Sequence, residues 1–502
     1  MASIREIKLT NTLSGKKETL KPLVPGKIKM YSCGPTVWNF IHIGNLRSGV
    51  VSDMFFKYFK RVGYDVKYVR NYTDVDDKII AQADKEKTTA SDLAKKYIHE
   101  VEKDFLMAGM AEPTVKTTVT QYMSKIISMI ETIISKGHAY EVEGEVLYSV
   151  ESFEGYGKLS KRKLEDNEAG LRVEVDPKKK NPFDFTLWKP AKKGEPFWKS
   201  PWGEGRPGWH IECSAMSCDQ LGDQMDIHHG GEDLIFPHHE NEIAQSEAAS
   251  GHVPFSTIWL HHAFLNLSNQ KMSKSLGNIM LAREFLDQYG GEFARYMLLS
   301  THYRSIINFA DETVEQTLQG LERIYLAKEK ALQMSQFKSA MPDMMSEIAW
   351  GEFVADIQKT KKLIDEAYAN DFNIPEVLAS LFTLIREFNR ILATPKAATT
   401  PAGGLAGLEL LKIFDEDIFG ILGFGGADPK RILSHLTQIK AKRLQSQGVQ
   451  TLTEAEILQA IEDRKQARLN RDFAKADQIR KDLESKGVLL KDSPGGTTWE
   501  FI

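Results

Sequence analysis

The chain has 502 residues, 42% of them hydrophobic, which is enough for several domains with their own cores. The formal net charge is −4, so the whole-chain balance gives no indication of nucleic-acid binding and local charge must carry that argument. No basic start precedes an apolar stretch, and no apolar run is long enough to cross a bilayer, so we expect a cytoplasmic protein. The cysteines are odd in number and scattered, which argues against a disulfide framework: Cys33, Cys213 and Cys218.

The first strong elements are a strand, a helix and a second strand. Residues 27–33 are predicted to be a strand that ends at a Gly-Pro break. From Gly44 apolar residues recur at helical spacing, with Gly63 as a C-cap, and another strand follows at 64–70. This order predicts an α/β fold with a Rossmann-like parallel sheet, whose ligands bind at the carboxyl ends of the strands.

The rest of the chain is predicted to form further units. Residues 85–140 have a helical pattern, and 144–200 are irregular and rich in proline, lysine and aromatic residues. We expect four regions: a catalytic domain over 1–310 with an insertion at about 115–200, a helical bundle over 311–393, a linker region rich in small residues over 394–428, and a C-terminal unit over 429–502.

Two short motifs carry the nucleotide chemistry. His42-Ile43-Gly44-Asn45 opens the first helix, where free backbone N–H groups and the helix dipole favour a phosphate. Gly44 permits close approach of ATP, and His42 can donate a hydrogen bond to its α-phosphate. The loop Lys271-Met272-Ser273-Lys274-Ser275 is cationic, so Lys271 and Lys274 can clamp the polyphosphate together with Ser273. Either motif alone is as easily a chance match, but the pair in this order predicts an ATP site.

The two motifs resemble the "HIGH" and "KMSKS" motifs of class I aminoacyl-tRNA synthetases. Asn45 stands where a histidine would be expected, and asparagine can still hydrogen-bond to the nucleotide. The resemblance implies that His42, Asn45, Lys271 and Lys274 act in catalysis, and that Gly44 and Ser273 help to bind ATP. Magnesium is expected with the ATP, although no residue can be named as its ligand.

A second group of residues suits a metal ion. His238 and Glu242 are four residues apart, so on a helix both face the same way. Zinc binds cysteine sulfur, histidine nitrogen and carboxylate oxygen, and the two candidate cysteines, Cys33 and Cys213, are 180 residues apart in the sequence. From residue chemistry alone, buried free cysteines and a capping glutamate are the better interpretation.

Longer segments resemble the cysteinyl-tRNA synthetase family over essentially the whole chain. They are Tyr31–Trp38 (YSCGPTVW), Asn181–Lys189 (NPFDFTLWK), Gly208–Cys218 (GWHIECSAMSC), Asp226–Glu242 (DIHHGGEDLIFPHHENE) and Gly496–Trp499 (GTTW). The resemblance implies one zinc ion held by Cys33, Cys213, His238 and Glu242, with the substrate thiolate as a further ligand. A thiolate is preferred over a neutral hydroxyl by zinc, which would separate cysteine from serine without editing.

Other residues receive roles from the same resemblance. Cys218 is expected in the core, and His239 is the alternative metal ligand if the helix register differs. His229 stands where a glycine would be more usual, and we expect structural roles for His261 and His262. The bound amino acid is expected to contact the following residues: Gly34, Thr73, Trp209, His228 and Asp233.

The C-terminal region is locally basic. Residues 430–502 contain fourteen lysines and arginines against ten aspartates and glutamates, a net charge of +4. Residues 464–481 are predicted to form one helix whose cations could contact phosphates, although such helices are usually just solvated. The resemblance implies an anticodon-binding unit. Trp499 could stack on a base or fill a core.

These observations predict a cysteine–tRNA ligase. We expect it to activate L-cysteine with ATP and transfer the cysteinyl group to the 3′ end of tRNA(Cys), as a monomer that needs no membrane. The first alternative is a paralogous cysteine:amino-sugar ligase that uses the same adenylate, and such enzymes lack the C-terminal unit. The second is a non-catalytic zinc and tRNA-binding protein, which the intact His42, Lys271 and Lys274 disfavour.

Overall fold

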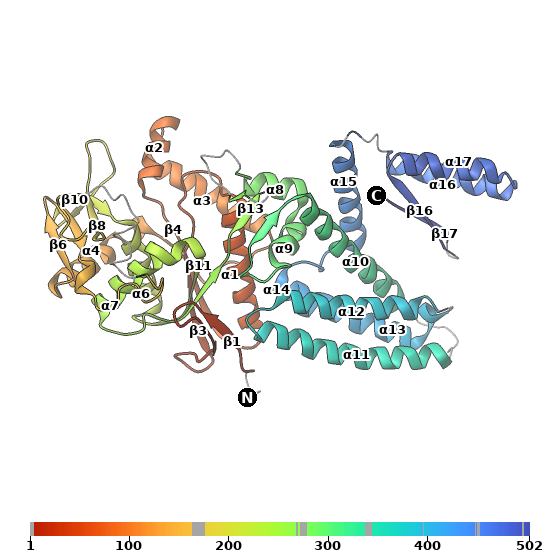
Figure 1. Ribbon diagram of the computed structural model, residues 1–502, viewed down its shortest axis with the longest axis horizontal. Helices are drawn as coiled ribbons and strands as arrows, with labels where there is room; N and C mark the ends of the chain where they lie inside the picture. Colours follow the sequence, from red (N-terminus) through yellow and green to blue (C-terminus); the bar gives the residue numbers. More distant parts are fainter. Residues whose placement is uncertain are drawn as a thin grey trace.

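The centre of the molecule is a five-stranded parallel sheet, ordered β12-β11-β3-β4-β5 (Figure 1). The computed structural model describes residues 5–162, 176–267, 270–271, 279–336, 344–394, 396–446, 448, 452–493 and 496–501. The strands of the sheet are β3 (Lys27–Ser32), β4 (Asp65–Tyr72), β5 (Val115–Thr118), β11 (Met225–Gly231) and β12 (Ser256–His262). The predicted strands 27–33 and 64–70 are therefore β3 and β4, and the predicted parallel sheet is confirmed.

Helices cover both faces of this sheet because side chains alternate along each strand. Met30 and Tyr68 pack into the large core with α1 (Ile43–Arg61), whereas Tyr31 and Val69 pack on the opposite side. The α1 face also carries α3 (Ala90–Met107), α8 (Ala282–Tyr289) and α9 (Gly291–Leu299), and the other face carries α6 (Trp209–Leu221) and α7 (Glu240–Ser250). Gly63, with φ +97°, lets the chain turn away after α1 as predicted.

The insertion has more regular structure than its sequence predicts. It contains α4 (Met123–Ser135) and a five-stranded antiparallel sheet ordered β6-β7-β8-β10-β9. Its strands are β6 (Ala139–Val142), β7 (Glu145–Tyr148), β8 (Phe185–Pro190), β9 (Trp198–Ser200) and β10 (Gly203–Pro207). The expectation of an irregular segment over 144–200 is thus wrong for these strands, which are too short to show a period. The helical pattern over 85–140 also fails at β5 and β6, since only α2 (Asp77–Glu86), α3 and α4 are α-helices there.

Smaller sheets flank the parallel sheet. The hairpin of β1 (Lys8–Asn11) and β2 (Lys16–Thr19) lies beside β12. A three-stranded sheet ordered β14-β13-β15 consists of β13 (Leu265–Leu267), β14 (Gln270–Lys271) and β15 (Ile307–Phe309). Lys271 of the second motif belongs to β14, while Ser273 and Lys274 lie outside the described residues.

A helical bundle follows the sheets and occupies the lower right of Figure 1. It contains α10 (Asp311–Ser335), α11 (Met344–Ala369), α12 (Ile374–Leu392), α13 (Pro401–Lys412) and α14 (Gly420–Leu422). The expected linker over 394–428 is therefore wrong for α13 and α14, which pack in this bundle. A Cβ on Gly407 would lie 2.7 Å from the carbonyl oxygen of Ala331 in α10. The small residues of α13 serve close helix packing and not a flexible connection.

The first helix joins the bundle to the sheet. In α1 a buried Asp53 pairs with Arg295 at 2.7 Å, and Arg61 pairs with Asp417 of the bundle at 2.9 Å. Arg295 also donates to the carbonyl of Leu422, so it connects α9 to α14. Helix α1 therefore reaches from the expected phosphate site at its N-terminus to the bundle at its C-terminus.

The C-terminal unit projects at the right of Figure 1, apart from the catalytic region. It contains α15 (Pro429–Ser446), α16 (Glu454–Leu469), α17 (Phe473–Ser485), β16 (Val488–Ser493) and β17 (Gly496–Phe501). The single helix predicted over 464–481 is wrong, because Arg471 at φ 60° breaks it into α16 and α17. Trp499 packs on Phe501 against the small core of this unit, which favours the second of its two expected roles.

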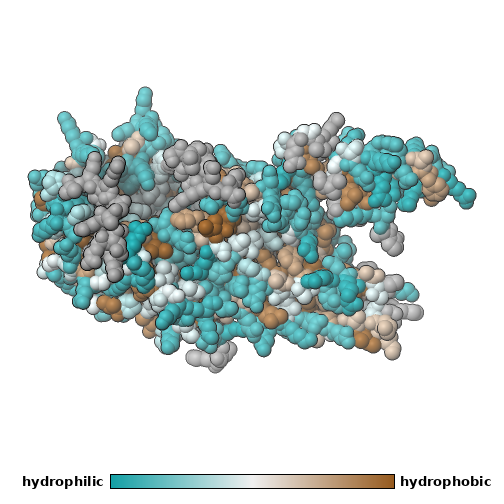
Figure 2. Space-filling model, viewed as in Figure 1, coloured by the Kyte–Doolittle hydropathy of each residue, from teal (hydrophilic) through white to brown (hydrophobic). Residues whose placement is uncertain are grey.

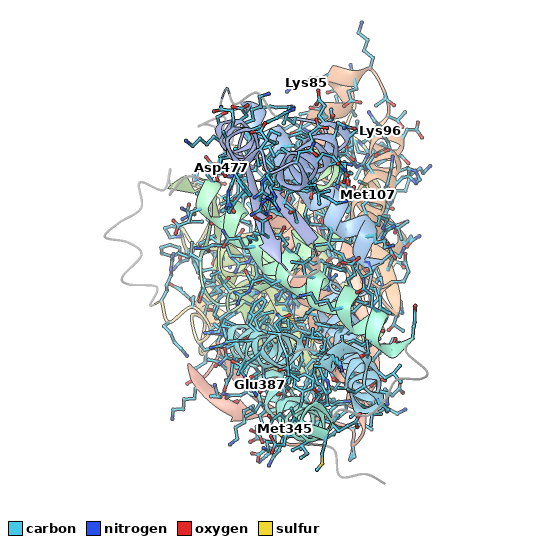
Figure 3. All side chains as sticks on the ribbon, turned by 90° about the vertical axis from the view of Figure 1, so that its right-hand side faces the viewer. Lys85, Lys96, Met107, Met345, Glu387 and Asp477 are labelled. Atoms are coloured by element: carbon cyan, nitrogen blue, oxygen red, sulfur yellow. The ribbon has the colours of Figure 1, made fainter. Side chains whose placement is uncertain are left out.

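Two further views show how this unit is exposed. Its visible face is mostly hydrophilic in Figure 2. In Figure 3, where the right-hand side of Figure 1 faces the viewer, Asp477 of α17 lies at the top and Met345 and Glu387 of the bundle lie at the bottom. The unit and the bundle thus present separate ends on this side. Within the described residues no helix is long and apolar enough to span a membrane.

Candidate active site

The first motif caps helix α1. The backbone N–H of Asn45 donates to Nδ1 of His42 at 3.2 Å, and the Asn45 side-chain oxygen accepts from the His42 N–H at 3.3 Å. This reciprocal capping box gives Asn45 a defined structural position at N3 of the helix. Because Nδ1 accepts a hydrogen bond, a neutral His42 carries its proton on Nε2. The histidine is thereby prepared to donate from Nε2.

Residues 280–282, which follow the second motif in the sequence, lie directly beside the first motif. Ile43 N donates to Met280 O at 3.1 Å, Ala282 N donates to Ile41 O at 2.8 Å, and His42 and Leu281 form an antiparallel bridge. Residues 280–282, which follow the second motif, are therefore joined to the first motif although the two segments are far apart in the sequence. Lys271 has its backbone in β14, and Lys274 and Ser273 are outside the described residues.

A cavity of about 700 Å³ opens at this edge of the sheet. It is lined by backbone and side chains of the first motif and by residues from the strand ends. Among the expected site residues, the lining includes His42, Gly44, Asn45, Cys33, Gly34, Trp209 and Asp233. The cavity joins the expected phosphate position to the candidate metal ligands, so one bound molecule can touch both.

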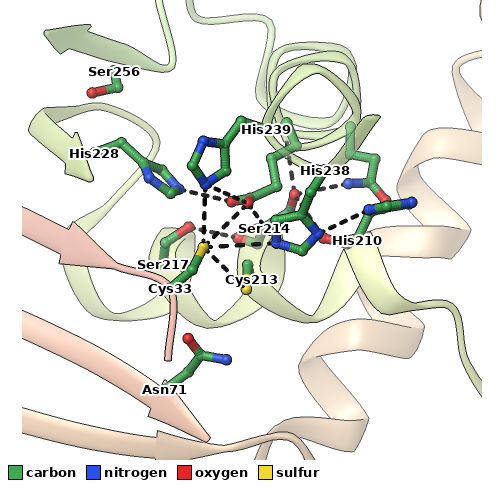
Figure 4. A network of polar contacts seen from close by, with 12 residues as sticks. Cys33, Asn71, His210, Cys213, Ser214, Ser217, His228, His238, His239 and Ser256 are labelled. Carbon is green, nitrogen blue, oxygen red and sulfur yellow. Dashed lines mark hydrogen bonds and ion pairs between the residues drawn. The ribbon is translucent and has the colours of Figure 1, made fainter. Parts of the chain in front are cut away.

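Four candidate metal ligands converge at the wall of this cavity (Figure 4). Cys33 follows β3, and its Sγ lies 3.8 Å from Sγ of Cys213 in α6 and 3.7 Å from Nε2 of His238. Glu242 Oε1 lies 3.6 Å from Cys33 Sγ and 3.0 Å from His238 Nε2. The fold thus brings together two cysteines that are 180 residues apart in the sequence. This thiol cluster consists of Cys33, Cys213, His238 and Glu242.

The dimensions of the thiol cluster fit a tetrahedral metal site. Two metal–sulfur bonds of about 2.3 Å at the tetrahedral angle would place the sulfurs about 3.8 Å apart, which is the separation of Cys33 and Cys213. The four donor atoms lie within 4.8 Å of one another. Two thiols, an imidazole and a carboxylate also form a donor set that divalent transition metals accept.

The charges of the thiol cluster also favour a bound metal ion. Burial raises the pKa of Cys33, and the neighbouring Cys213 and Glu242 raise it further. Burial alone would raise the pKa of Glu242 too, but His228 and His238 hold it at about 2. A hydrogen bond with Cys33 lowers the pKa of Cys213 to about 6. The cluster therefore places an ionised carboxylate beside two sulfur atoms, and a divalent cation would stabilise their deprotonated forms.

A second set of donors overlaps the first. His239, the alternative ligand, has its Nε2 3.5 Å from Cys33 Sγ, and its Nδ1 is 2.8 Å from Nε2 of His261. His239 and His228 form a compact set with Cys33 and Glu242. The structure therefore keeps both histidines near the candidate metal position, and only the first set contains both thiols.

Supporting residues of the thiol cluster were missed by sequence reasoning. His210 Nδ1 lies 2.9 Å from Nδ1 of His238 and so orients its Nε2 toward the cluster. Glu212 is buried and accepts from the hydroxyl of Thr73 at 3.1 Å, while burial and the adjacent Cys213 raise its pKa. Both residues lie within three positions of Cys213, in the segment Gly208–Cys218 that resembles the family, and that is the sequence signal that could have found them.

The expected amino-acid contacts divide into two groups. Gly34, Trp209 and Asp233 line the cavity, and Trp209 is 43% exposed with its ring centroid 4.4 Å from that of His238. Thr73 and His228 are buried behind the cavity wall, where His228 Nε2 lies 2.9 Å from Glu242 Oε2. Gly34 cannot be replaced without movement, since a Cβ there would lie 1.6 Å from the carbonyl oxygen of Asn71.

Structural roles are expected for His261, His262 and Cys218; both histidines are buried, and His262 also lines the cavity. His229 keeps regular strand pairing in β11, and its ring contacts Ser52 at 2.7 Å, so its replacement of a glycine leaves the backbone undisturbed. His261 and His262 are buried, and burial lowers the pKa of both. Cys218 packs beside the core, and burial raises its pKa to about 12.

Comparison with known proteins identifies the same chemistry. Residues 19–319 match the family model for the class I (C) tRNA synthetase catalytic domain, and residues 364–423 match the DALR domain. A cysteine–tRNA ligase of Pelobacter propionicus is 46% identical over 99% of both chains, and one of Geobacter sulfurreducens is 44% identical over 98% of this chain and 99% of that protein.

Solved structures confirm the fold. A methionyl-tRNA synthetase of Mycobacterium tuberculosis bound to methionyl-adenylate has a TM-score of 0.58 at 13% identity, covering 81% of this chain and 93% of that chain. A putative arginyl-tRNA synthetase of Campylobacter jejuni has a TM-score of 0.54 at 14% identity, covering 82% and 95%. The family model and the sequence relatives, which match over nearly the whole chain, show that the chain belongs to the cysteinyl-tRNA synthetase family of class I aminoacyl-tRNA synthetases.

Proposed function

We propose that this enzyme joins L-cysteine to ATP as cysteinyl-adenylate, releasing pyrophosphate, and then transfers the cysteinyl group to the terminal ribose of tRNA(Cys). The observation that carries the proposal is the shared cavity, which the first motif and Cys33 of the thiol cluster both line. The carboxylate of cysteine is already a nucleophile, so the protein needs only to position it and stabilise the charge that develops on the α-phosphate.

Residues of the first motif would supply that stabilisation. The N-terminus of α1 offers backbone N–H groups, and His42 offers the Nε2–H that its hydrogen bond from Asn45 favours. Lys271 and Lys274 would hold the polyphosphate. Residues 280–282, which follow them in the sequence, pair with residues 41–43 at the start of α1. Magnesium would accompany the ATP. Asn45 supports His42 through the capping box.

The thiol cluster would select the amino acid. We propose that Cys33, Cys213, His238 and Glu242 hold one zinc ion, because this set contains both thiols and zinc favours sulfur ligands. Zinc held there would favour the thiolate of cysteine over the hydroxyl of serine. Gly34, Trp209 and Asp233 would contact the amino acid directly, while Thr73 and His228 would act through Glu212 and Glu242.

The C-terminal unit would bind the tRNA away from the active site. Its predicted cations are not equally available: Arg464 is buried and forms a two-point ion pair with Asp492, with both N–O distances at 2.8 Å. At the turn between α16 and α17, Leu469 and Phe473 are exposed beside Arg471. Exposed aromatic and basic side chains suit unpaired RNA bases and phosphates, so we propose this turn as the anticodon-binding surface.

The alternatives are not favoured by the sequence relatives, which are cysteine–tRNA ligases that match this chain through its C-terminal unit. We propose a cytoplasmic location, since all three cysteines are free thiols, as expected in a reducing compartment. We also propose that the protein is a monomer. Light scattering on the purified protein would test the monomer.

The deciding experiment measures cysteine-dependent exchange of pyrophosphate into ATP, followed by charging of purified tRNA(Cys). Exchange and charging together are expected. Absence of exchange would exclude both enzyme functions, and exchange without charging would favour an amino-sugar ligase. Zinc content of His238→Ala and His239→Ala then distinguishes the two ligand sets, because only the histidine that binds the metal should change its stoichiometry.

A further inference from the structure

Arg70 is a buried cation in the wall of the active-site cavity. It lies near the carboxyl end of β4 and is 5% exposed, yet it contributes to the lining of the cavity. Its guanidinium carbon lies 4.4 Å from the ring centroid of Phe105, which lines the same cavity. The aromatic ring holds the guanidinium at a fixed position.

The donors of Arg70 are mostly unused. Nη2 donates to the hydroxyl of Tyr72 at 3.3 Å, whereas Nε and Nη1 have no hydrogen-bond partner. Within the described residues no carboxylate lies within 4.0 Å of the guanidinium. Glu102, the acid whose charge reaches it, pairs with Lys116 at 2.6 Å. Burying an unpaired cation costs several kcal/mol, so such a group is expected to gain an anionic partner.

Two other buried arginines show what a structural role looks like. Arg47 in α1 donates to four backbone carbonyls, those of Ala263, Phe264, Tyr303 and Ser305. Arg295 pairs with Asp53 and donates to the carbonyl of Leu422. Each leaves a single nitrogen without a hydrogen-bond partner, Nε of Arg47 and Nη2 of Arg295, while its other nitrogens hold elements together. Arg70, by contrast, directs its free donors to nothing in the described part of the protein.

The position of Arg70 in the sheet indicates which anion it meets. The strand order reverses between β3 and β11, where a nucleotide is expected to bind. Arg70 on β4 lies on the other side of β3. We infer that Arg70 binds a phosphodiester at the 3′ end of the tRNA and so positions the terminal ribose, an assignment that rests on the proposed function.

The test separates the two half-reactions. Replacing Arg70 with methionine should lower single-turnover transfer from enzyme-bound cysteinyl-adenylate to tRNA by about 10- to 100-fold, the usual effect of losing hydrogen bonds to a charged group. Pyrophosphate exchange should stay within about twofold of wild type. If the wild-type enzyme itself shows no exchange, the proposed function fails, and Arg70 is not the cause.

A neutral linkage in the tRNA tests the contact directly. A tRNA with a methylphosphonate at the last or penultimate linkage should slow transfer by the wild-type enzyme about as much as Arg70→Met does. The Arg70→Met enzyme should be insensitive to the one linkage that Arg70 contacts. Arg70→Lys should recover part of the transfer rate because it restores the charge but not the two-point geometry.

Matched controls keep a folding defect apart from a binding defect. Lys67→Met removes an exposed cation from the same strand, and Tyr72→Phe removes the hydrogen-bond partner but leaves Arg70 charged; both should transfer at nearly the wild-type rate. The proposal is overturned if exchange falls as much as transfer in Arg70→Met, or if transfer is unchanged. It is also overturned if Arg70→Met remains sensitive to both modified linkages.

Discussion

In the thiol cluster Cys213, His238 and Glu242 are at most 2% exposed, whereas at the turn between α16 and α17 Leu469 and Phe473 are 68% and 61% exposed. In the proposed function the cluster would distinguish a thiol from a hydroxyl, a difference that shape alone detects poorly. The turn would bind a large, flexible polyanion, for which exposed charges and rings suffice. Recognition of a small chemical difference requires buried and mutually oriented donors, and recognition of RNA does not.

The largest effect is expected when a ligand of the thiol cluster is replaced. Cys213→Ser should abolish bound zinc and lower cysteine-dependent exchange by more than about 100-fold, because losing a ligand exceeds the usual effect of losing a supporting contact. Metal analysis and exchange assays check both. Cys218→Ser, five residues away in the same helix, is the matched control and should keep its metal and its activity. Full zinc content in Cys213→Ser would refute the ligand set.

A change in salt concentration should affect the thiol cluster and the turn between α16 and α17 differently, without any mutation. Raising the salt from about 50 to 200 mM should lower kcat/KM for tRNA by about 10- to 50-fold, as expected for about three phosphate contacts. The KM for cysteine should change little, because the thiol cluster is buried and its charges are weakly screened. A parallel loss in both constants would contradict the division of labour proposed for the two regions.

A smaller effect is expected at the exposed turn. Phe473→Ala should lower kcat/KM for tRNA charging by about tenfold, since stacking of one base contributes about 1–3 kcal/mol. Pyrophosphate exchange should be unchanged, because the turn is remote from the cavity. Leu458→Ala, at an apolar position on α16 that is 52% exposed, serves as the control. Unaltered charging by Phe473→Ala would exclude this turn as the RNA contact.

The smallest effect concerns stability of the C-terminal unit. Hydrogen bonds from Arg464 and Thr497 lower the pKa of Asp492, so its contribution is present above its ordinary pKa and is lost as pH falls through the lowered value. Acid below about pH 4 should therefore loosen this unit. Asp492→Asn should cost about 1 kcal/mol at neutral pH, since the pair is partly exposed. Trp499 fluorescence would report both changes.

The sequence was most informative where a period was long or a resemblance was specific. The helix from Gly44 and the strands around it were predicted because their apolar spacing continues for many residues. The proximity of Cys33 and Cys213 was predicted from the family resemblance and not from their spacing, because only the folded sheet brings them close together. The strands of the insertion were missed because β6 and β7 have four residues each, too few to establish alternation.

Other features could not be predicted because they depend on packing. The glycines of α13 suggest a linker in the sequence, but their meaning comes from the neighbouring helix α10. The position of Asn45 in a capping box requires knowing where α1 begins. Arg70 is one cation in a strand-like segment, and only the fold shows that its donors are unsatisfied in a cavity.

The bridge between His42 and Leu281 has an evolutionary consequence. Because residues 280–282, which follow the second motif, are held to the first motif by local backbone pairing, the distance between these segments does not depend on the length of chain that separates them. The insertion, with its own antiparallel sheet and its own core, can therefore grow, shrink or be exchanged while the nucleotide site keeps its dimensions. A lineage could therefore alter this module without redesigning the chemistry of activation.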